Sequence, residues 1–133
     1  MKMVTVDTDV VSYLFKHDTR GALYHPHLSN TLPALSFMTL AELERWAIAS
    51  HWGANKRQQL TQFLQTYVIL FPDDALCRTW GTVVEQVKRS GYQIAVADAW
   101  IAATALQFGI PLVTHNRKDY AHVNGLTIIS EAP

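Results

Sequence analysis

The 133-residue sequence has a single cysteine, Cys77, and no excess of charge of either sign. One cysteine excludes an internal disulfide and the usual clusters of zinc-binding thiolates, and it fits a reducing cytosol best. Eleven acidic residues balance eleven basic ones. This balance excludes the global basic field that draws many proteins to nucleic acids or anionic membranes. Any recognition of a polyanion must therefore be local.

Long apolar runs and low-complexity tracts are also missing. The opening MKMVTVDTDV has one lysine and a short apolar stretch interrupted by acids, and no later apolar run approaches membrane length. We therefore expect a soluble cytoplasmic protein with no membrane partner. The length suits one domain over residues 1–133, and 49% hydrophobic residues suffice for one substantial core.

Short β-rich runs alternate with segments of helical periodicity. Strands are predicted at 3–6, 34–38, 67–71, 111–116 and 126–130. Helices are predicted at 10–17, 39–52, 55–66, 73–90 and 94–105, with shorter helices or loops at 21–33 and 117–122. This alternation predicts an α/β fold, with a mainly parallel central sheet flanked by helices on both faces as an α/β/α sandwich. In such sheets the ligand site lies at the carboxyl ends of the strands.

Taken one at a time, most acidic residues have an ordinary structural explanation. Asp7 and Asp9 lie between a strand and a helix, where carboxylates are favoured as caps. Glu42 stands three residues after Thr39, which is the spacing of a capping box, and Asp119 has the spacing of a capped turn. The other acids are expected to complement a helix dipole or to be solvated: Asp18, Glu44, Asp73, Asp74, Glu85 and Glu131.

Asp98 is the exception, because it lies in the apolar stretch IAVADAWIAATA with no basic residue within several positions. Helical spacing puts it on the face expected to press on the sheet, together with Ile94, Ile101, Ala102 and Ala105. If the helix begins only near residue 95, Asp98 accepts free backbone N–H groups of the first turn. In either position an unpaired charge at the edge of the core is costly, so a positive partner is expected close by.

Four of the acids are predicted at one edge of the sheet. Asp7 and Asp119 each follow a strand. Glu42 begins the helix after another strand, and Asp98 lies near the amino end of a helix. Carboxylates that converge without an arginine or lysine repel one another, and a hard divalent cation with oxygen ligands relieves that repulsion. The sequence therefore predicts an Mg²⁺ or Mn²⁺ site.

Four motifs carry a family resemblance: VDTDVVSYL at 6–14, TLAEL at 39–43, ADAWIAATAL at 97–106 and PLVTHNRKDY at 111–120. In order and spacing they resemble the PIN-domain ribonucleases, and among them the toxins of VapBC-type toxin–antitoxin modules, over nearly the whole chain. The resemblance places the family's acidic quartet on Asp7, Glu42, Asp98 and Asp119. It places the Thr/Ser-x-Asn-x-x-Asp element on Thr114, Asn116 and Asp119. Two positions depart from the common pattern, with Asp9 where Asn is frequent and Tyr120 where Phe is common.

The resemblance implies an Mg²⁺-dependent endoribonuclease that hydrolyses RNA phosphodiester bonds. One or two metal ions would be held by Asp7, Asp98 and Asp119, and Glu42 would ligate metal or act as a base. The residues that would orient these carboxylates are Thr8, Thr114 and Asn116. Arg117 and Lys118 would contact substrate phosphates or be ordinary surface charges.

The resemblance also implies protein partners. Family members commonly form homodimers and are inhibited by a cognate antitoxin whose tail covers the acidic cleft, in a heterotetramer or larger complex. Apolar residues of the early helices are candidates for a groove that accepts a partner helix or, alternatively, for core packing: Tyr13, Phe15, Trp46, Ile48 and Trp52.

Two other functions fit parts of the sequence. MVTVDTDVV also resembles the opening of haloacid dehalogenase-like phosphatases, in which Asp7 would be the nucleophile and Asp9 a general acid. That interpretation leaves Asp98 and Asp119 unexplained. The second alternative is a non-catalytic PIN-like binding domain. The histidines at positions 25 and 27 have no nearby third ligand and are expected to be exposed.

Overall fold

The five strands of the protein form one parallel sheet. The computed structural model describes residues 1–133, with β1 (Lys2–Val6), β2 (Thr31–Ser36), β3 (Val68–Leu70), β4 (Leu112–Val113) and β5 (Ile128–Ile129). The strand order is β3-β2-β1-β4-β5, and every pair is parallel. β2 and β3 are added in sequence on one side of β1, and the chain then crosses to the other side of β1 to form β4 and β5. In an open α/β sheet this reversal is where ligands bind, beyond the carboxyl ends of the strands.

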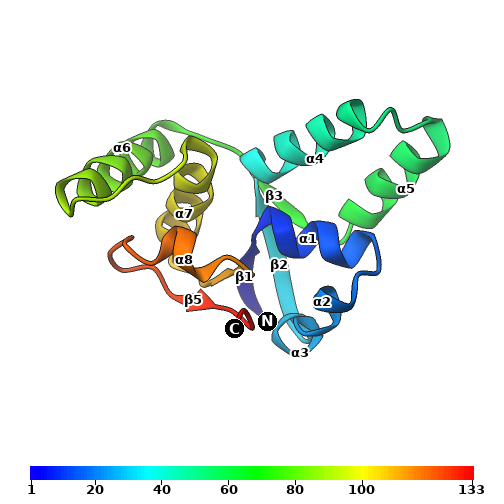
Figure 1. Ribbon diagram of the computed structural model, residues 1–133, viewed down its shortest axis with the longest axis horizontal. Helices are drawn as coiled ribbons and strands as arrows, with labels where there is room; N and C mark the ends of the chain where they lie inside the picture. Colours follow the sequence, from blue (N-terminus) through cyan, green and yellow to red (C-terminus); the bar gives the residue numbers. More distant parts are fainter.

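Helices cover both faces of the sheet, which confirms the predicted α/β/α architecture. They are α1 (Thr8–Phe15), α2 (Thr19–Ala22), α3 (His25–Leu28), α4 (Phe37–Ala49), α5 (Ala54–Leu64), α6 (Asp74–Arg89), α7 (Val96–Phe108) and α8 (Arg117–Tyr120). Figure 1 shows α6 and α7 on one side of the sheet and α1, α4 and α5 on the other. No helix has both the length and the apolar character needed to cross a membrane.

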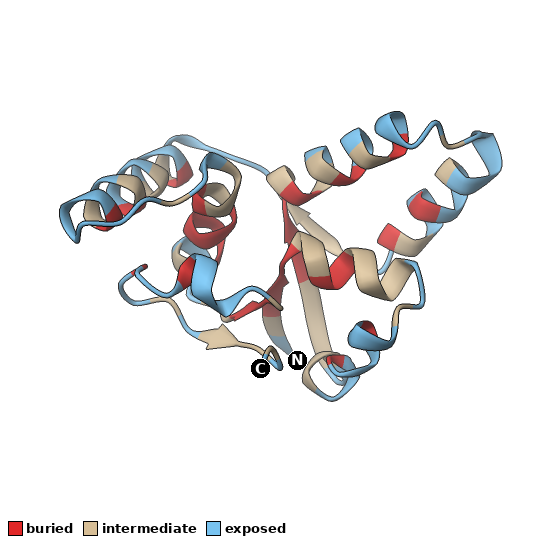
Figure 2. Cartoon of the chain, in the orientation of Figure 1, coloured by how far each residue is buried: buried red, intermediate tan, exposed pale blue.

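Two hydrophobic clusters lie on opposite faces of the sheet. Leu112 belongs to the cluster beneath α6 and α7, whereas Val113 belongs to the cluster beneath α1, α4 and α5. This division follows from the alternation of side chains along a strand. Figure 2 shows the buried residues along the central strands and on the inner helix faces.

Helix α7 is adapted to lie close to the sheet. Four of its alanines, at positions 99, 102, 103 and 105, are completely buried. The helix contacts both β1 and β2. Small side chains permit this approach, because closely packed interiors leave no room for larger ones. The amino-terminal turn of α7, which carries Asp98, is thereby held at the edge of the sheet.

The predicted start of α4 is wrong, and so is the predicted capping box. The helix begins at Phe37 with Ser36 as its cap, and the Ser36 hydroxyl accepts a hydrogen bond from the Met38 backbone N–H at 3.1 Å. Thr39 is buried inside the first turn and does not cap. The reason is that β2 occupies Thr31–Ser36 rather than 34–38, ending at a serine that is itself a good cap.

The predicted end of α4 is also wrong. The helix stops at Ala49 instead of Trp52, and His51 follows it with a left-handed φ of 54°. Gly53 does not end α4 but caps the start of α5. The predicted strand 111–116 is likewise shorter, since only Leu112 and Val113 pair with neighbouring strands. The residues after Val113 are thereby left to form the turn that reaches the candidate site.

Candidate active site

Asp7 is the most buried acidic residue of the candidate site. It follows β1 directly and caps α1. Its carboxylate accepts hydrogen bonds from the Thr8 backbone N–H at 2.8 Å and from the Thr114 hydroxyl at 2.7 Å. Only 5% of the residue is exposed, and no basic side chain forms an ion pair with it. Burial, followed by the charge of Asp9, raises the pKa of Asp7 to about 7 despite these two hydrogen bonds.

The turn after β4 places Thr114 beside Asp7, because β4 pairs with β1 and the two residues follow these strands directly. Thr114 is fully buried, and its hydroxyl also accepts a hydrogen bond from the Asn116 backbone N–H at 3.0 Å. This is the contact expected of a residue that orients a carboxylate. Asn116 takes part through its backbone, while its exposed side chain makes no capping hydrogen bond. Arg117 is exposed and forms no ion pair.

Glu42 is held by α1 rather than by its own helix. The Thr8 hydroxyl donates to Oε1 of Glu42 at 2.8 Å and lies 3.0 Å from the Thr39 hydroxyl. Glu42 and Thr8 are both half-buried. The two residues predicted to form a capping box, Thr39 and Glu42, are thus linked through a third one from α1.

Asp98 lies in the first turn of α7, yet it caps nothing. The cap is Ala95, and no backbone N–H donates to the Asp98 carboxylate. Its hydrogen bond comes instead from the Tyr120 hydroxyl in α8 at 3.2 Å. Burial raises the pKa of Asp98 to about 6, the bond from Tyr120 lowers it, and the charge of Asp119 raises it further.

Tyr120 is a site residue for which the sequence analysis assigned no role. It is only 1% exposed, and its hydroxyl is positioned to affect both Asp98 and Asp7. Burial raises the pKa of Tyr120, so the phenol remains a hydrogen-bond donor. The sequence did contain a sign of this role, because Tyr120 stands where the family commonly has Phe. A buried tyrosine hydroxyl needs a hydrogen-bond partner, which phenylalanine does not.

Asp119 and Asp9 complete the acidic edge. Asp119 is exposed in α8 and lines a cavity together with Asp98 and Lys118. Asp9 accepts hydrogen bonds from the backbone N–H groups of Val10 at 2.7 Å and His115 at 3.1 Å. Burial raises the pKa of Asp9 as well. The edge therefore holds five carboxylates, and none of them is in an ion pair.

The chemistry of these donors fits a hard divalent cation. All are carboxylate or hydroxyl oxygens, the ligands that Mg²⁺ prefers, and the buried Asp7 carboxylate has no positive partner within the chain. The acids do not form a closed cage, since no three of them converge tightly enough to surround an ion. Mg²⁺ usually keeps several waters and needs only one or two carboxylates, so an open arrangement is compatible with it.

The sequence matches a known family, described as PIN domain, over residues 4–126. The chain belongs to the PIN domain family. Among its relatives, VapC ribonuclease Y4jK of Sinorhizobium fredii is 33% identical over 140 residues, covering 96% of each chain.

Solved structures agree with this PIN assignment. VapBC2 from Rickettsia felis, bound to a DNA fragment from its promoter, superposes with a TM-score of 0.84 at 23% identity, covering 96% of this chain and 98% of that one, which establishes the fold. VapBC-5 from Mycobacterium tuberculosis, a member of the VapBC family of toxin-antitoxin systems, has a TM-score of 0.71 at 26% identity and covers 98% and 99% of the two chains.

The PIN relationship excludes the haloacid dehalogenase-like interpretation. Asp73 and Asp74, the two directly adjacent acids of the chain, belong to the start of α6, where Asp73 caps the helix by accepting a hydrogen bond from the Leu76 backbone N–H at 2.8 Å. Asp7 is, moreover, not isolated, because the charge of Asp9 and that of Asp98 both raise its pKa.

Most of the apolar residues that were candidates for a partner groove belong instead to the packed interior. Phe15, Trp46 and Trp52 pack on one another and on Phe63, with ring centroids 4.6 to 6.3 Å apart. Ile48 is different, because it is 62% exposed on α4.

Proposed function

We propose that this protein is a metal-dependent endoribonuclease and the toxin of a type II toxin–antitoxin system. The observation that carries the proposal is the row of carboxylates at the crossover edge of a PIN-type sheet, with the buried Asp7 lacking any cationic partner. A relative named as a VapC ribonuclease, similar over 96% of both chains, supports RNA as the substrate.

In this proposal Asp7, Asp98 and Asp119 bind Mg²⁺ or Mn²⁺. A cation held there would supply Lewis-acid chemistry, polarising the scissile phosphate and lowering the pKa of a bound water. Glu42 either ligates the cation or accepts the proton of the attacking water, and the Thr8 hydroxyl at 2.8 Å keeps it in place. Thr114 orients Asp7 in the same way.

The basic residues next to Asp119 complete the proposed machinery. Arg117 and Lys118 are exposed at the start of α8. We assign them to the substrate backbone, because phosphate oxygens are usually contacted by such side chains. Since the chain is neutral overall, these local charges must provide most of the electrostatic attraction for RNA.

The proposal includes partners and a compartment. We place residues 1–133, as one PIN domain, in the cytoplasm with a cognate antitoxin that covers the acidic edge. The protein is expected to form a homodimer, and with antitoxin a heterotetramer or larger assembly. The similarity to VapBC-5, described as part of a toxin-antitoxin system, supports this assignment.

The decisive experiment is to sequence RNA ends after expression of the wild type and of Asp7→Ala. We expect new ends that require Asp7, and the same cut positions with purified protein, Mg²⁺ and RNA. Addition of EDTA should stop cleavage. If the RNA ends are the same for both proteins, the ribonuclease proposal fails.

Calorimetry separates the enzyme from a non-catalytic binding domain of the same fold. We expect the wild type to bind Mg²⁺ and Asp98→Asn to bind it much more weakly, because the variant lacks one of three proposed ligands. Thermal unfolding should find Asp98→Asn at least as stable as the wild type in metal-free buffer, since its carboxylate is half-buried and unpaired. Unchanged Mg²⁺ binding in the variant would contradict the assignment of Asp98.

A further inference from the structure

A cavity of about 450 Å³ opens directly beside the acidic edge. Its lining includes the acids Asp98 and Asp119 and the aromatic residues Tyr92 and His122. Its volume is within the range of small-molecule sites, which run from roughly 300 to 1,000 Å³. The cavity is thus lined both by acids for which phosphate chemistry is proposed and by aromatic residues to which no function has been assigned.

The two aromatic residues of this lining form a stack. The centroids of the Tyr92 and His122 rings are 3.4 Å apart, and their planes differ by 9°. Tyr92 follows α6, whereas His122 follows α8, so the stack joins two connections that are 30 residues apart in the chain. Tyr92 is 50% exposed. Part of this aromatic surface therefore remains available to a ligand.

Hydrogen bonds from α6 hold both halves of the stack. The Gln86 side-chain amide donates to the His122 carbonyl at 2.9 Å, and its oxygen accepts from the Asn124 backbone N–H at 3.0 Å. On the other side, the Tyr92 backbone N–H donates to the Val87 carbonyl at 3.2 Å. Because the two backbone segments are held in place and their rings already stack, binding loses less conformational entropy on ordering them.

We propose that the Tyr92–His122 stack binds a base of single-stranded RNA, next to the phosphate that is cut. This inference rests on the proposed ribonuclease function. The cavity can hold both parts of a nucleotide, because Lys118 and the acids Asp98 and Asp119 line it together with the two aromatic rings. Sequence-tolerant stacking on tyrosine and histidine is a usual way to bind unpaired bases, whereas bases within a duplex are already stacked on their neighbours.

Stacking of a base on these rings would also provide affinity for RNA that does not depend on a net positive charge. A chain with no net charge cannot attract RNA by a broad electrostatic field. A stacked base contributes independently of salt-sensitive phosphate contacts. The expected substrate is therefore an unpaired segment, with the base beside the cut occupying the cavity.

The test compares Tyr92→Ala with Tyr92→Phe and with a matched control, Phe108→Ala. Phe108 is 48% exposed, close to the value for Tyr92, but it lies at the far end of α7 from Asp98. On a single-stranded RNA oligonucleotide we expect Tyr92→Ala to raise KM about tenfold with a smaller change in kcat, since base stacking contributes measurably to affinity. Tyr92→Phe should restore both values, and Phe108→Ala should leave them unchanged.

A second measurement uses the wild-type protein and does not depend on the folding of a variant. RNA carrying 5-iodouridine is irradiated with the protein in EDTA, and the linked peptides are identified by mass spectrometry. We expect crosslinks to Tyr92 or His122. Crosslinks found only elsewhere, or a Tyr92→Ala enzyme with unchanged KM, would overturn the proposal. If the wild type cuts no RNA, the ribonuclease function fails instead, and the crosslink still reports whether the stack binds a base.

Discussion

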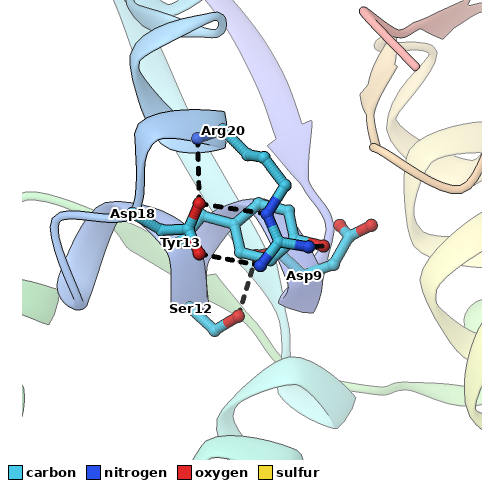
Figure 3. Close-up of polar contacts among 5 residues, drawn as sticks. All are labelled: Asp9, Ser12, Tyr13, Asp18 and Arg20. Atoms are coloured by element: carbon cyan, nitrogen blue, oxygen red, sulfur yellow. Dashed lines mark hydrogen bonds and ion pairs between the residues drawn. The ribbon is translucent and has the colours of Figure 1, made fainter. Parts of the chain in front are cut away.

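Asp7 and Asp18 have the same local role and opposite electrostatics. Asp7 is the amino-terminal cap of α1, and Asp18 is the amino-terminal cap of α2. Each carboxylate accepts a hydrogen bond from a backbone N–H at less than 3 Å. Asp18 is also paired with the guanidinium of Arg20 through contacts of 2.7 and 3.0 Å (Figure 3). The hydrogen bonds from Arg20 hold the pKa of Asp18 well below its usual range, whereas burial raises the pKa of Asp7 to about 7.

The difference is whether the chain supplies a positive partner. The Asp18 site is complete in itself, and its arginine also lies 4.0 Å from the centre of the Tyr13 ring. Tyr13 thereby belongs to the Asp18 cluster on the α1–α2 corner (Figure 3). Asp7 is more buried than Asp18 and has only neutral donors and other acids around it. The cap with its own cation needs no further partner, whereas the buried cap without one is consistent with the proposed external cation.

The largest difference between Asp7 and Asp18 is expected in RNA cleavage. We expect Asp7→Asn to reduce kcat/KM by more than about 100-fold, because loss of an outer partner of a metal ligand alone costs roughly 10- to 100-fold. Asp18→Asn should stay within a few-fold of the wild type. Both rates are measured on the same oligonucleotide with saturating Mg²⁺. Equal losses in the two variants would show that capping, and not cation binding, accounts for the role of Asp7.

The second prediction concerns stability as a function of pH in EDTA. The folded-state pKa of Asp7 lies above the unfolded value, so the folded protein binds the extra proton between about pH 4 and 7. Its stabilising contribution is present below pH 4 and is lost as pH rises toward 7, by an amount on the order of a few kcal/mol. The raised pKa of Asp98 acts in the same direction. Asp18, with its depressed pKa, contributes stability above about pH 4 and adds no such decline.

Urea unfolding at pH 5, 6, 7 and 8 measures this decline directly. Asp7→Asn should flatten the curve and be the more stable protein at pH 7.5, whereas Asp18→Asn should keep the wild-type slope. Added Mg²⁺ should restore wild-type stability at the upper end of the range, since a ligand of the folded state stabilises it. Wild-type stability that rises between pH 5 and 7 would contradict the raised pKa of Asp7.

The third prediction tests the neutral donors that Asp7 has in place of an arginine. Thr114→Val keeps the shape of the side chain but removes the hydroxyl that donates to Asp7 and accepts from the Asn116 N–H. We expect roughly a 10- to 100-fold loss of activity, with weaker Mg²⁺ binding in calorimetry. Thr114→Ser retains the hydroxyl and should recover most of both. Full activity in the valine variant would remove Thr114 from the site.

Local sequence patterns were sufficient to predict the alternation of strands and helices. Apolar runs bounded by glycine, proline and polar residues are short-range signals, so the αβ order and the parallel sheet followed from them. The end of β2 was not predictable in this way. Ser36 and Thr39 are both good caps, and pairing of Ser36 with β3 decides between them.

The acidic residues could be grouped from sequence, but their partners could not. Asp98 was recognised because a carboxylate in an alanine-rich helix has no local explanation. Its bond to Tyr120 joins residues 22 apart, and the bond from Thr114 to Asp7 spans 107 residues. Such contacts depend on the order of the strands, which places β4 next to β1. Their tertiary origin is why the role of Tyr120 was missed.

The smallest expected effect is that of Asp9→Asn. Asparagine caps as well as aspartate, so the bond from the Val10 N–H can remain, while the second oxygen that accepts from the His115 N–H is lost. One hydrogen bond contributes about 1 kcal/mol net, which corresponds to about fivefold in rate.

Removing the charge of Asp9 should also lower the pKa of Asp7, because that charge is the largest influence on the pKa of Asp7 after burial. We therefore expect cleavage within about tenfold of the wild type and a shallower decline of stability toward pH 7. A loss above 100-fold would mean that Asp9 takes part in the chemistry itself, and the site would then need five working carboxylates instead of four.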